Sequence, residues 1–299
     1  RAFAIETVEN LLCDSGLKVI FRRELPVDAK AIEQRGTHLQ LPIFQWIFTL
    51  ADSKADSDFD SIIYNTLVKI ESHAYQDNSL EGLYPLSMSS QTQVLKGRLN
   101  SWELVPYFLD LSEPDHCVHT LFFHTRFSTN TDPHPSMAQP FRLMAHNGEL
   151  NTDKKNRLSE IAEAKARKRH IDRPKGQSDS SRFDQTLGYR IHEGKVDLVS
   201  AVVSMMPPAW ENDNSLSPSV RDMFEYFSLY EEKNDGPAAV IFGDGRIIGA
   251  RLDRLGLRPL RSVETDEYLS VMSEAGQVQF PREQIISLGR IEAGGMMYY

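Results

Sequence analysis

Apolar residues recur every three to four positions along several stretches of this chain, a spacing typical of amphipathic helices. The pattern predicts helices at 5–12, 59–70, 101–111 and 180–190, one that opens after Asn151 or Thr152, and one that opens at Ser217-Pro218. Gly16 is placed to end the first helix, and Asp56 or Asp58 to cap the second. In the helix after Asn151 or Thr152, we expect Leu158 and Ile161 to face inward.

Short apolar runs bounded by turn residues predict strands between these helices. They fall at 17–21, 43–50, 121–127, 141–145, 238–242, 246–252 and 296–299, with two more inside 83–97; the apolar stretch 196–206 fits either type. The strands follow one another in pairs rather than alternating with helices. This order favours antiparallel sheets with helices on their faces over a parallel, doubly wound sheet.

Composition narrows the class of protein. The chain has 299 residues, a net charge of -9 and an apolar fraction of 40%, which fits one large domain over 1–299 and argues against a nucleic-acid-binding protein. No apolar run is long enough to span a membrane, and two cysteines give no disulfide framework, so a reducing cytoplasm is expected. Because the chain opens at Arg1 and closes in a strand pattern, we expect it to be a piece of a longer polypeptide.

Polar groups follow the two central strands. Arg126 comes after the apolar run that begins at Leu121, so it lies at the edge of a core and needs an anion there. That anion is either a structural carboxylate or the carboxylate of a substrate held by two parallel hydrogen bonds.

Two further features have a structural and a functional interpretation. Asn147-Gly148 after a strand is a hairpin signal, but its carboxamide and backbone amide could also bind the oxygen of a tetrahedral intermediate. Asp179 precedes a helix, where it is either a first-turn residue or a fixed partner for a substrate ammonium.

Metal and nucleic-acid sites are disfavoured. His119 and His124 are expected on opposite faces of one strand, and there is no paired Cys or His-x-x-x-His helix. The basic run 165–169 has no interleaved aromatic residues and fits a solvated helix end.

Taken together, a series of motifs in this order resembles the class II glutamine amidotransferase domain of the glutamate synthase large subunit. The matching pieces are Ser89-Ser90-Gln91-Thr92 with Lys96-Gly97, the segments 124–131, 146–152, 178–181 and 208–213, Asp235-Gly236-Pro237, and the segment 252–259. The series spans nearly the whole chain.

The resemblance implies a fold and a reaction. The fold is α+β, a four-layer α/β/β/α sandwich of the N-terminal-nucleophile hydrolase type, with two antiparallel sheets between helical layers. The reaction converts L-glutamine to L-glutamate and ammonia, which passes to 2-oxoglutarate in the synthase domain or subunit. By resemblance, Arg126 holds the α-carboxylate of glutamine, Asp179 its α-ammonium, and Asn147 and Gly148 form the oxyanion hole, while Thr129 lines the pocket. The parent family uses flavin mononucleotide and an iron-sulfur cluster, but no stretch of this chain resembles their sites.

One departure concerns the nucleophile. In the family it is a cysteine at the first position of the mature chain, whose own α-amine acts as the base, whereas Arg1 stands at position one here. Cys13 and Cys117 lie inside predicted elements without matching flanks. We therefore expect this chain to lack the nucleophile segment and to be inactive alone; the alternative is a pseudoenzyme that binds an amino acid or a partner subunit without catalysis.

Overall fold

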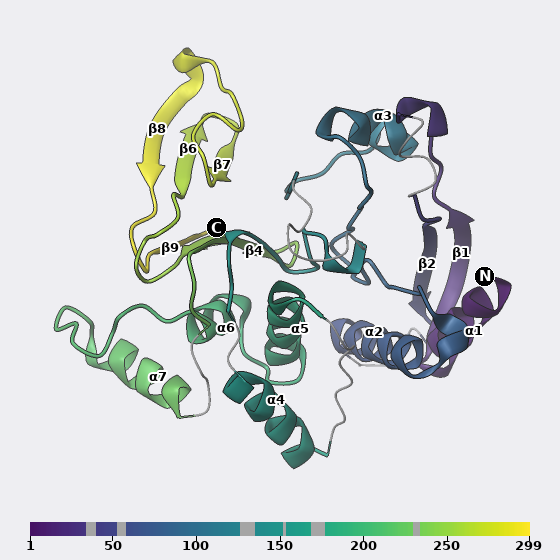
Figure 1. Cartoon of the computed structure of the whole chain (residues 1–299), viewed down its shortest axis with the longest axis horizontal. Helices are drawn as coiled ribbons and strands as arrows, with labels where there is room; N and C mark the ends of the chain where they lie inside the picture. The colour runs from purple at the N-terminus through teal and green to yellow at the C-terminus, as the bar shows by residue number, and fades with distance from the viewer. Residues whose placement is uncertain (34–39, 53–57, 126–134, 152–153, 169–176, 230–233) are drawn as a thin grey trace. The chain divides into compact units, whose positions relative to one another are not determined.

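The computed structural model describes residues 1–299 except 34–39, 53–57, 126–134, 152–153, 169–176 and 230–233, and it leaves out the side chains of 154–157, 159 and 160. The chain divides into two compact units, the first Arg1–Gln139 with Asp172–Lys175, and the second Pro140–Ile171 with Gly176–Tyr299. Figure 1 shows the elements of both units, coloured by residue number from the N-terminus to the C-terminus.

The first unit is built mainly from two long helices, a single helical turn and an antiparallel strand pair. Its main elements are α1 (Ala2–Asp14), β1 (Leu17–Glu24), β2 (Phe44–Leu50), α2 (Phe59–Gln76) and the single turn α3 (Leu104–Tyr107). Gly16 has a φ of +78°, which allows the sharp turn from α1 into β1. Asp58 caps α2 by accepting the Ser61 backbone N–H at 3.3 Å. These elements confirm the predicted helices and strands at the start of the chain, while Asp56 lies outside the described residues.

Three predicted strands in this unit are wrong, two inside 83–97 and the one that begins at Leu121. Residues 83–97 contain no strand, because serine side chains take the backbone donors that a ladder would use. Ser87 Oγ accepts the Val94 N–H at 3.1 Å, and Ser89 Oγ accepts the N–H groups of Gln91 and Thr92 at 3.0 and 3.1 Å.

The described part of the other run, 121–125, is not a strand either, so the prediction that His119 and His124 face opposite sides of one fails with it. The side chains of Leu121 and Phe123 are 71% and 48% exposed, so burial does not hold this run in place. The helix predicted at 101–111 forms as short pieces around α3, interrupted where the chain turns at Phe108.

The second unit carries most of the regular structure. Its helices are α4 (Lys154–Ala166), α5 (Asp179–His192), α6 (Leu198–Met205) and α7 (Pro218–Ser228), and its strands are β3 (Met144–Gly148), β4 (Ala238–Gly243), β5 (Ile248–Leu252), β6 (Arg261–Thr265), β7 (Leu269–Met272), β8 (Ile285–Arg290) and β9 (Met296–Tyr298). Within the described residues the strands form two antiparallel sheets, in the orders β3-β4-β5-β9 and β7-β6-β8. The predicted hairpin at 238–252 and the antiparallel character of the sheets are confirmed.

The two faces of the β3-β4-β5-β9 sheet pack against different partners. On one face Val240 and Phe242 join the core formed by α5 and α6, which includes Leu187 and Val202. The apolar stretch at 196–206 is therefore helical, with Asp197 as the cap of α6. The other face, with Ala239, Ala250 and Leu252, contacts the residues Leu260 and Ile291 that flank the second sheet.

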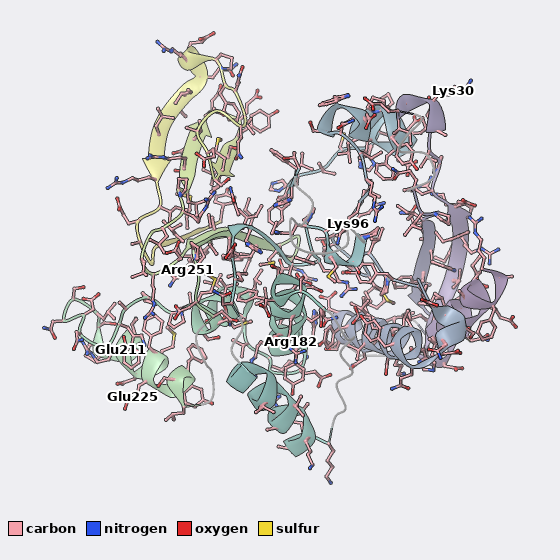
Figure 2. All side chains as sticks on the ribbon, viewed as in Figure 1. Lys30, Lys96, Arg182, Glu211, Glu225 and Arg251 are labelled. Carbon is pink, nitrogen blue, oxygen red and sulfur yellow. The ribbon has the colours of Figure 1, made fainter. Side chains whose placement is uncertain are left out.

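Arg251 joins β5 to the end of α6 (Figure 2). Its guanidinium is buried and donates to the carbonyl oxygen of Met206 at 3.0 and 2.6 Å and to that of Gly294 at 2.5 Å. Burial lowers the pKa of Arg251 to about 10. A cation at the C-terminus of a helix also suits the helix dipole.

The inward face of α4 differs from its prediction. Leu158 and Ile161 are 56% and 48% exposed, whereas Ala164 is buried. The helix is held by an ion pair between Glu163 and the buried Arg190 of α5, so a charged contact decides which face of α4 turns inward. Elsewhere, α7 begins as predicted, with Ser217 as its cap and proline at its first position.

Membrane-spanning character is absent from the helices of the described residues, none of which is long and apolar enough to cross a bilayer.

Candidate functional site

The candidate site in the second unit is built around β3. The strand was predicted at 141–145 but runs over Met144–Gly148. It starts later because the backbone N–H groups of Arg142 and Leu143 donate to the carboxylate of Asp184, at 3.3 and 2.8 Å, instead of entering a ladder. Asn147 and Gly148 are thus the last residues of a strand, paired with Ala239 and Ala238, and the hairpin turn predicted there is wrong.

Gly148 has to be a glycine. Its φ is +134°, and a Cβ at this position would lie 1.7 Å from the carbonyl oxygen of Pro237. Gly236 on the opposite segment is equally confined, with φ +122° and a Cβ position 2.1 Å from the carbonyl oxygen of Glu149. The two segments approach this closely because pairing continues beyond β3, where Glu149 N–H donates to Pro237 at 2.9 Å.

The carboxamide of Asn147 is held from the second sheet. Its Nδ2 donates to Ser273 Oγ at 2.9 Å, just after β7. Adjacent residues of a strand point to opposite faces, so Asn147 lies on the face away from α5, and His146 on the face toward it. Among the described strands β3 forms an edge of its sheet. Side chains from both faces of the sheet can therefore contact a small molecule that binds at this edge.

Asp179 lies at the start of α5, on the other side of the strand. Ser178 caps the helix by accepting the Ser181 backbone N–H at 3.1 Å, which makes Asp179 the first helical residue. An acidic side chain in the first turn of a helix interacts favourably with the helix dipole. The next residue, Ser180, has its Oγ 2.5 Å from Nε2 of His146. This contact brings the first turn of α5 to β3, one residue from both Asp179 and Asn147.

Two predicted site residues, Arg126 and Thr129, lie outside the described residues. Their roles stay predictions. His146, Ser180, Asp184 and Ser273 are contacts of the site to which the sequence analysis gave no role, although His146 and Ser180 lie in its motifs at 146–152 and 178–181. The only local signal for His146 was its spacing of two from Met144, which places both on one face of a strand.

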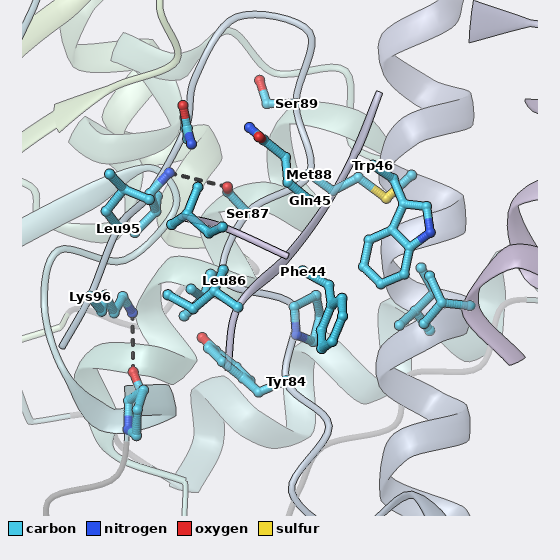
Figure 3. Close-up of a pocket in the computed structure, with 18 of the residues that line it drawn as sticks. Phe44, Gln45, Trp46, Tyr84, Leu86, Ser87, Met88, Ser89, Leu95 and Lys96 are labelled. Carbon is cyan, nitrogen blue, oxygen red and sulfur yellow. Dashed lines mark hydrogen bonds between the residues drawn. The ribbon is translucent and has the colours of Figure 1, made fainter. Parts of the chain in front are cut away.

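The first unit contains a cavity of about 590 Å³ between β2 and the segment 82–98 (Figure 3). Its walls are mainly apolar and aromatic, including Phe44, Trp46 and Tyr84, and they also carry serine, threonine and lysine residues of the motif at 89–97. The buried Lys96 has its Nζ 5.6 Å from the centre of the Tyr84 ring and donates to the carbonyl oxygen of Ala138 at 2.7 Å. No Asp or Glu occurs among the described residues that line the cavity. The described part of the cavity wall therefore offers no carboxylate to a ligand.

Alternative sites would use the two cysteines or a cluster of acidic and histidine side chains. Cys13 lies in α1 and Cys117 outside helices and strands, against the prediction that both lie inside elements, and both thiols are exposed and free. No group of three or more His, Cys, Asp or Glu side chains that could hold a metal ion occurs in the part of the chain that the structure describes.

Comparison with known proteins identifies the family. The model of the class II glutamine amidotransferases matches residues 1–299. The ferredoxin-dependent glutamate synthase of Antithamnion sp. is 35% identical over 94% of this chain and 19% of its own length. Ferredoxin-dependent glutamate synthase 2 of Synechocystis sp. is 33% identical over 99% of this chain and 20% of its own length. The NADH glutamate synthase of Schizosaccharomyces pombe is 33% identical over 94% of this chain and 14% of its own length.

This chain thus spans a fifth or less of the length of these relatives. The family model, by contrast, matches every residue of this chain from 1 to 299. The chain belongs to the class II glutamine amidotransferase family and is homologous to part of the glutamate synthases.

Proposed function

We propose that this chain is the glutamine-binding part of a glutamate synthase. In the reaction, L-glutamine and water give L-glutamate and ammonia, and the ammonia is passed to 2-oxoglutarate in a synthase domain or subunit. The observation that carries the proposal is the match of the class II amidotransferase family over residues 1–299, together with the glutamate synthase relatives.

The proposed substrate contacts use both charges of a free amino acid. Asp179 binds the α-ammonium and Arg126 the α-carboxylate, while Thr129 lines the pocket. Asn147 and Gly148 stabilise the oxyanion of the tetrahedral intermediate. The position of Asp179 at the start of α5 and the fixed carboxamide of Asn147 support this assignment.

The proposed fold is the four-layer sandwich of N-terminal-nucleophile hydrolases, formed by residues 1–299 as a single amidotransferase domain. The two-faced β3-β4-β5-β9 sheet supports it, because α5 and α6 cover one face and residues flanking a second antiparallel sheet cover the other.

Neither Cys13 nor Cys117 is the nucleophile in this proposal, and residues 1–299 do not hydrolyse glutamine alone. A catalytic thiol needs a base or a cationic neighbour that lowers its pKa. The Sγ of Cys117 donates to the carbonyl oxygen of Pro114 at 3.8 Å, a group that is neither a general base nor a cation. The same observation favours the second candidate, a pseudoenzyme that binds an amino acid or a subunit without catalysis.

The synthase chemistry of the relatives' family involves flavin mononucleotide and an iron-sulfur cluster, which we place outside this chain. A cluster held by thiolates takes about four cysteines, and the chain has two, Cys13 and Cys117. The two cysteines do not fit the cluster. The proposed partners are L-glutamine and the synthase domain, with neither nucleic acid nor membrane, and the expected compartment is the cytoplasm.

A glutaminase assay tests this proposal. We expect residues 1–299 to bind L-glutamine and release no ammonia from it, in the unsubstituted chain and in C13S and C117S. Ammonia release that either substitution abolishes would refute the nucleophile assignment. Glutamine binding without ammonia release fits both candidates, and the mature amino terminus of the parent polypeptide separates them. A cysteine at its first position would support the amidotransferase, and its absence the pseudoenzyme.

A further inference from the structure

Two polar contacts dock α5 against β3 and the residues before it. His146 Nε2 and Ser180 Oγ are 2.5 Å apart, and either group can be the donor. Asp184 accepts the backbone N–H groups of Arg142 and Leu143 at 3.3 and 2.8 Å. Ser180 and Asp184 are four residues apart, so they lie on one face of the helix, one turn above the other. Together these contacts fix both the rotation of α5 and its position along the strand.

Each contact contains one buried side chain, and each is partly buried as a whole. His146 is 6% exposed and Asp184 is 4% exposed, and Phe183 and Leu187 of the same helix lie in the core. Buried polar side chains have to form hydrogen bonds with defined partners, whereas apolar packing tolerates small shifts. Apolar packing holds α5 on the sheet, and the polar contacts select one position among those that the packing allows.

The contact between His146 and Ser180 joins the two parts of the candidate site, which lie on β3 and on α5. Ser180 follows Asp179 directly, and His146 precedes Asn147 directly. We propose that His146 and Ser180 are positioning residues, which hold the carboxylate of Asp179 at the distance from the end of β3 that the α-ammonium of a bound amino acid requires. This inference rests on the proposed function, since it assumes that Asp179 binds that ammonium.

Loss of the His146–Ser180 contact should affect binding of the α-ammonium and no other part of the ligand. Losing the contact releases the first turn of α5, so it weakens recognition of the ammonium while leaving the groups at the β3 end in place. A glutamine analogue without the α-amine, glutaramic acid, makes no use of Asp179. Its binding should therefore be insensitive to Ser180 and His146. A general loss of structure would weaken both ligands equally.

The test measures binding of L-glutamine and of glutaramic acid to residues 1–299 by isothermal titration calorimetry. The variants are S180A and H146L, which remove the contact, and H146Q, which keeps a side-chain N–H donor. Ser204 gives a control, because it is a helical serine of the same unit whose Oγ donates to the carbonyl oxygen of Ala201 in its own helix. The ratio of the two dissociation constants is taken on one preparation, so it does not depend on the fraction of folded protein.

We expect S180A and H146L to weaken L-glutamine binding about tenfold, as for loss of a charge-assisted contact, and to leave glutaramic acid unchanged. H146Q and S204A should keep the ratio of the unsubstituted chain, and S180A should add nothing to D179N. An unchanged ratio in S180A and H146L, or an additive D179N/S180A double variant, would overturn this inference alone. No binding of L-glutamine by the unsubstituted chain would overturn the proposed function itself, and this inference with it.

Discussion

Replacing Gly148 with alanine should be among the most destabilising single substitutions in the second unit. The new Cβ would lie 1.7 Å from the carbonyl oxygen of Pro237, more than an ångström inside the 3.0 Å below which neighbouring atoms have to shift. Relief of the overlap would separate β3 from the segment before β4 and break the Glu149–Pro237 hydrogen bond, at about 1 kcal/mol. The φ of +134° lies in a region that is nearly restricted to glycine, which adds about 1–3 kcal/mol. Together the two terms give about 2–4 kcal/mol of unfolding free energy.

Gly276 is the matched control for this substitution. It lies in the same unit at φ +86°, but nothing stands within 4 Å of its Cβ position. Alanine there should cost only the backbone term, about 1–2 kcal/mol. Urea unfolding followed by far-UV circular dichroism compares G148A and G276A directly. If G148A lost no more stability than G276A, the close approach of the two segments, and the reason for glycine at this position, would be wrong.

Three further predictions concern single side chains. R251M should lower the unfolding free energy by about 2–4 kcal/mol in urea melts, because it leaves buried carbonyl groups without donors, whereas R254M, which removes a partly exposed ion pair, should cost less than about 1 kcal/mol. S178A removes the cap of α5 and should cost about 1 kcal/mol in the same melts. The pKa of Glu103 lies below its ordinary 4.5 because its carboxylate accepts the Asn100 backbone N–H. Its stabilising effect should hold above pH 4.5 and fade as the pH falls through the lowered value. The protection of the Asn100 amide against hydrogen exchange, taken relative to its intrinsic exchange rate at each pH, should therefore fall in acid in the unsubstituted chain and not in E103Q.

Elements with strong local signals could be predicted from the sequence. The cap of α2 at Asp58 and the serine-proline start of α7 depend only on residues next to the helix start, and both helices formed where expected. Residues 83–97 misled the prediction because their apolar pattern fits strands, while Ser87 and Ser89 bind the backbone amides instead. Whether these backbone amides pair in a ladder or bind serine side chains depends on the geometry of the loop, which the spacing of apolar residues does not indicate.

The candidate site was predictable only in part. Asp179 at the start of a helix followed from the residues around it, and the structure has it there. The dipeptide Asn147-Gly148 suggested a turn, but pairing with residues some ninety positions later keeps the chain extended. The His146–Ser180 contact joins residues 34 apart in sequence, which no local pattern could reveal. The roles of Arg126 and Thr129 stay predictions.

The central claim is that Asp179 recognises the ammonium of a free amino acid. Calorimetric titration of L-glutamine into residues 1–299, D179N and D222N tests it most directly, because Asp222 is an exposed aspartate on α7 in the same unit, and both variants lose one negative charge. The account predicts that D179N weakens binding at least about tenfold while D222N binds as the unsubstituted chain does. Equal affinity in all three proteins would contradict it.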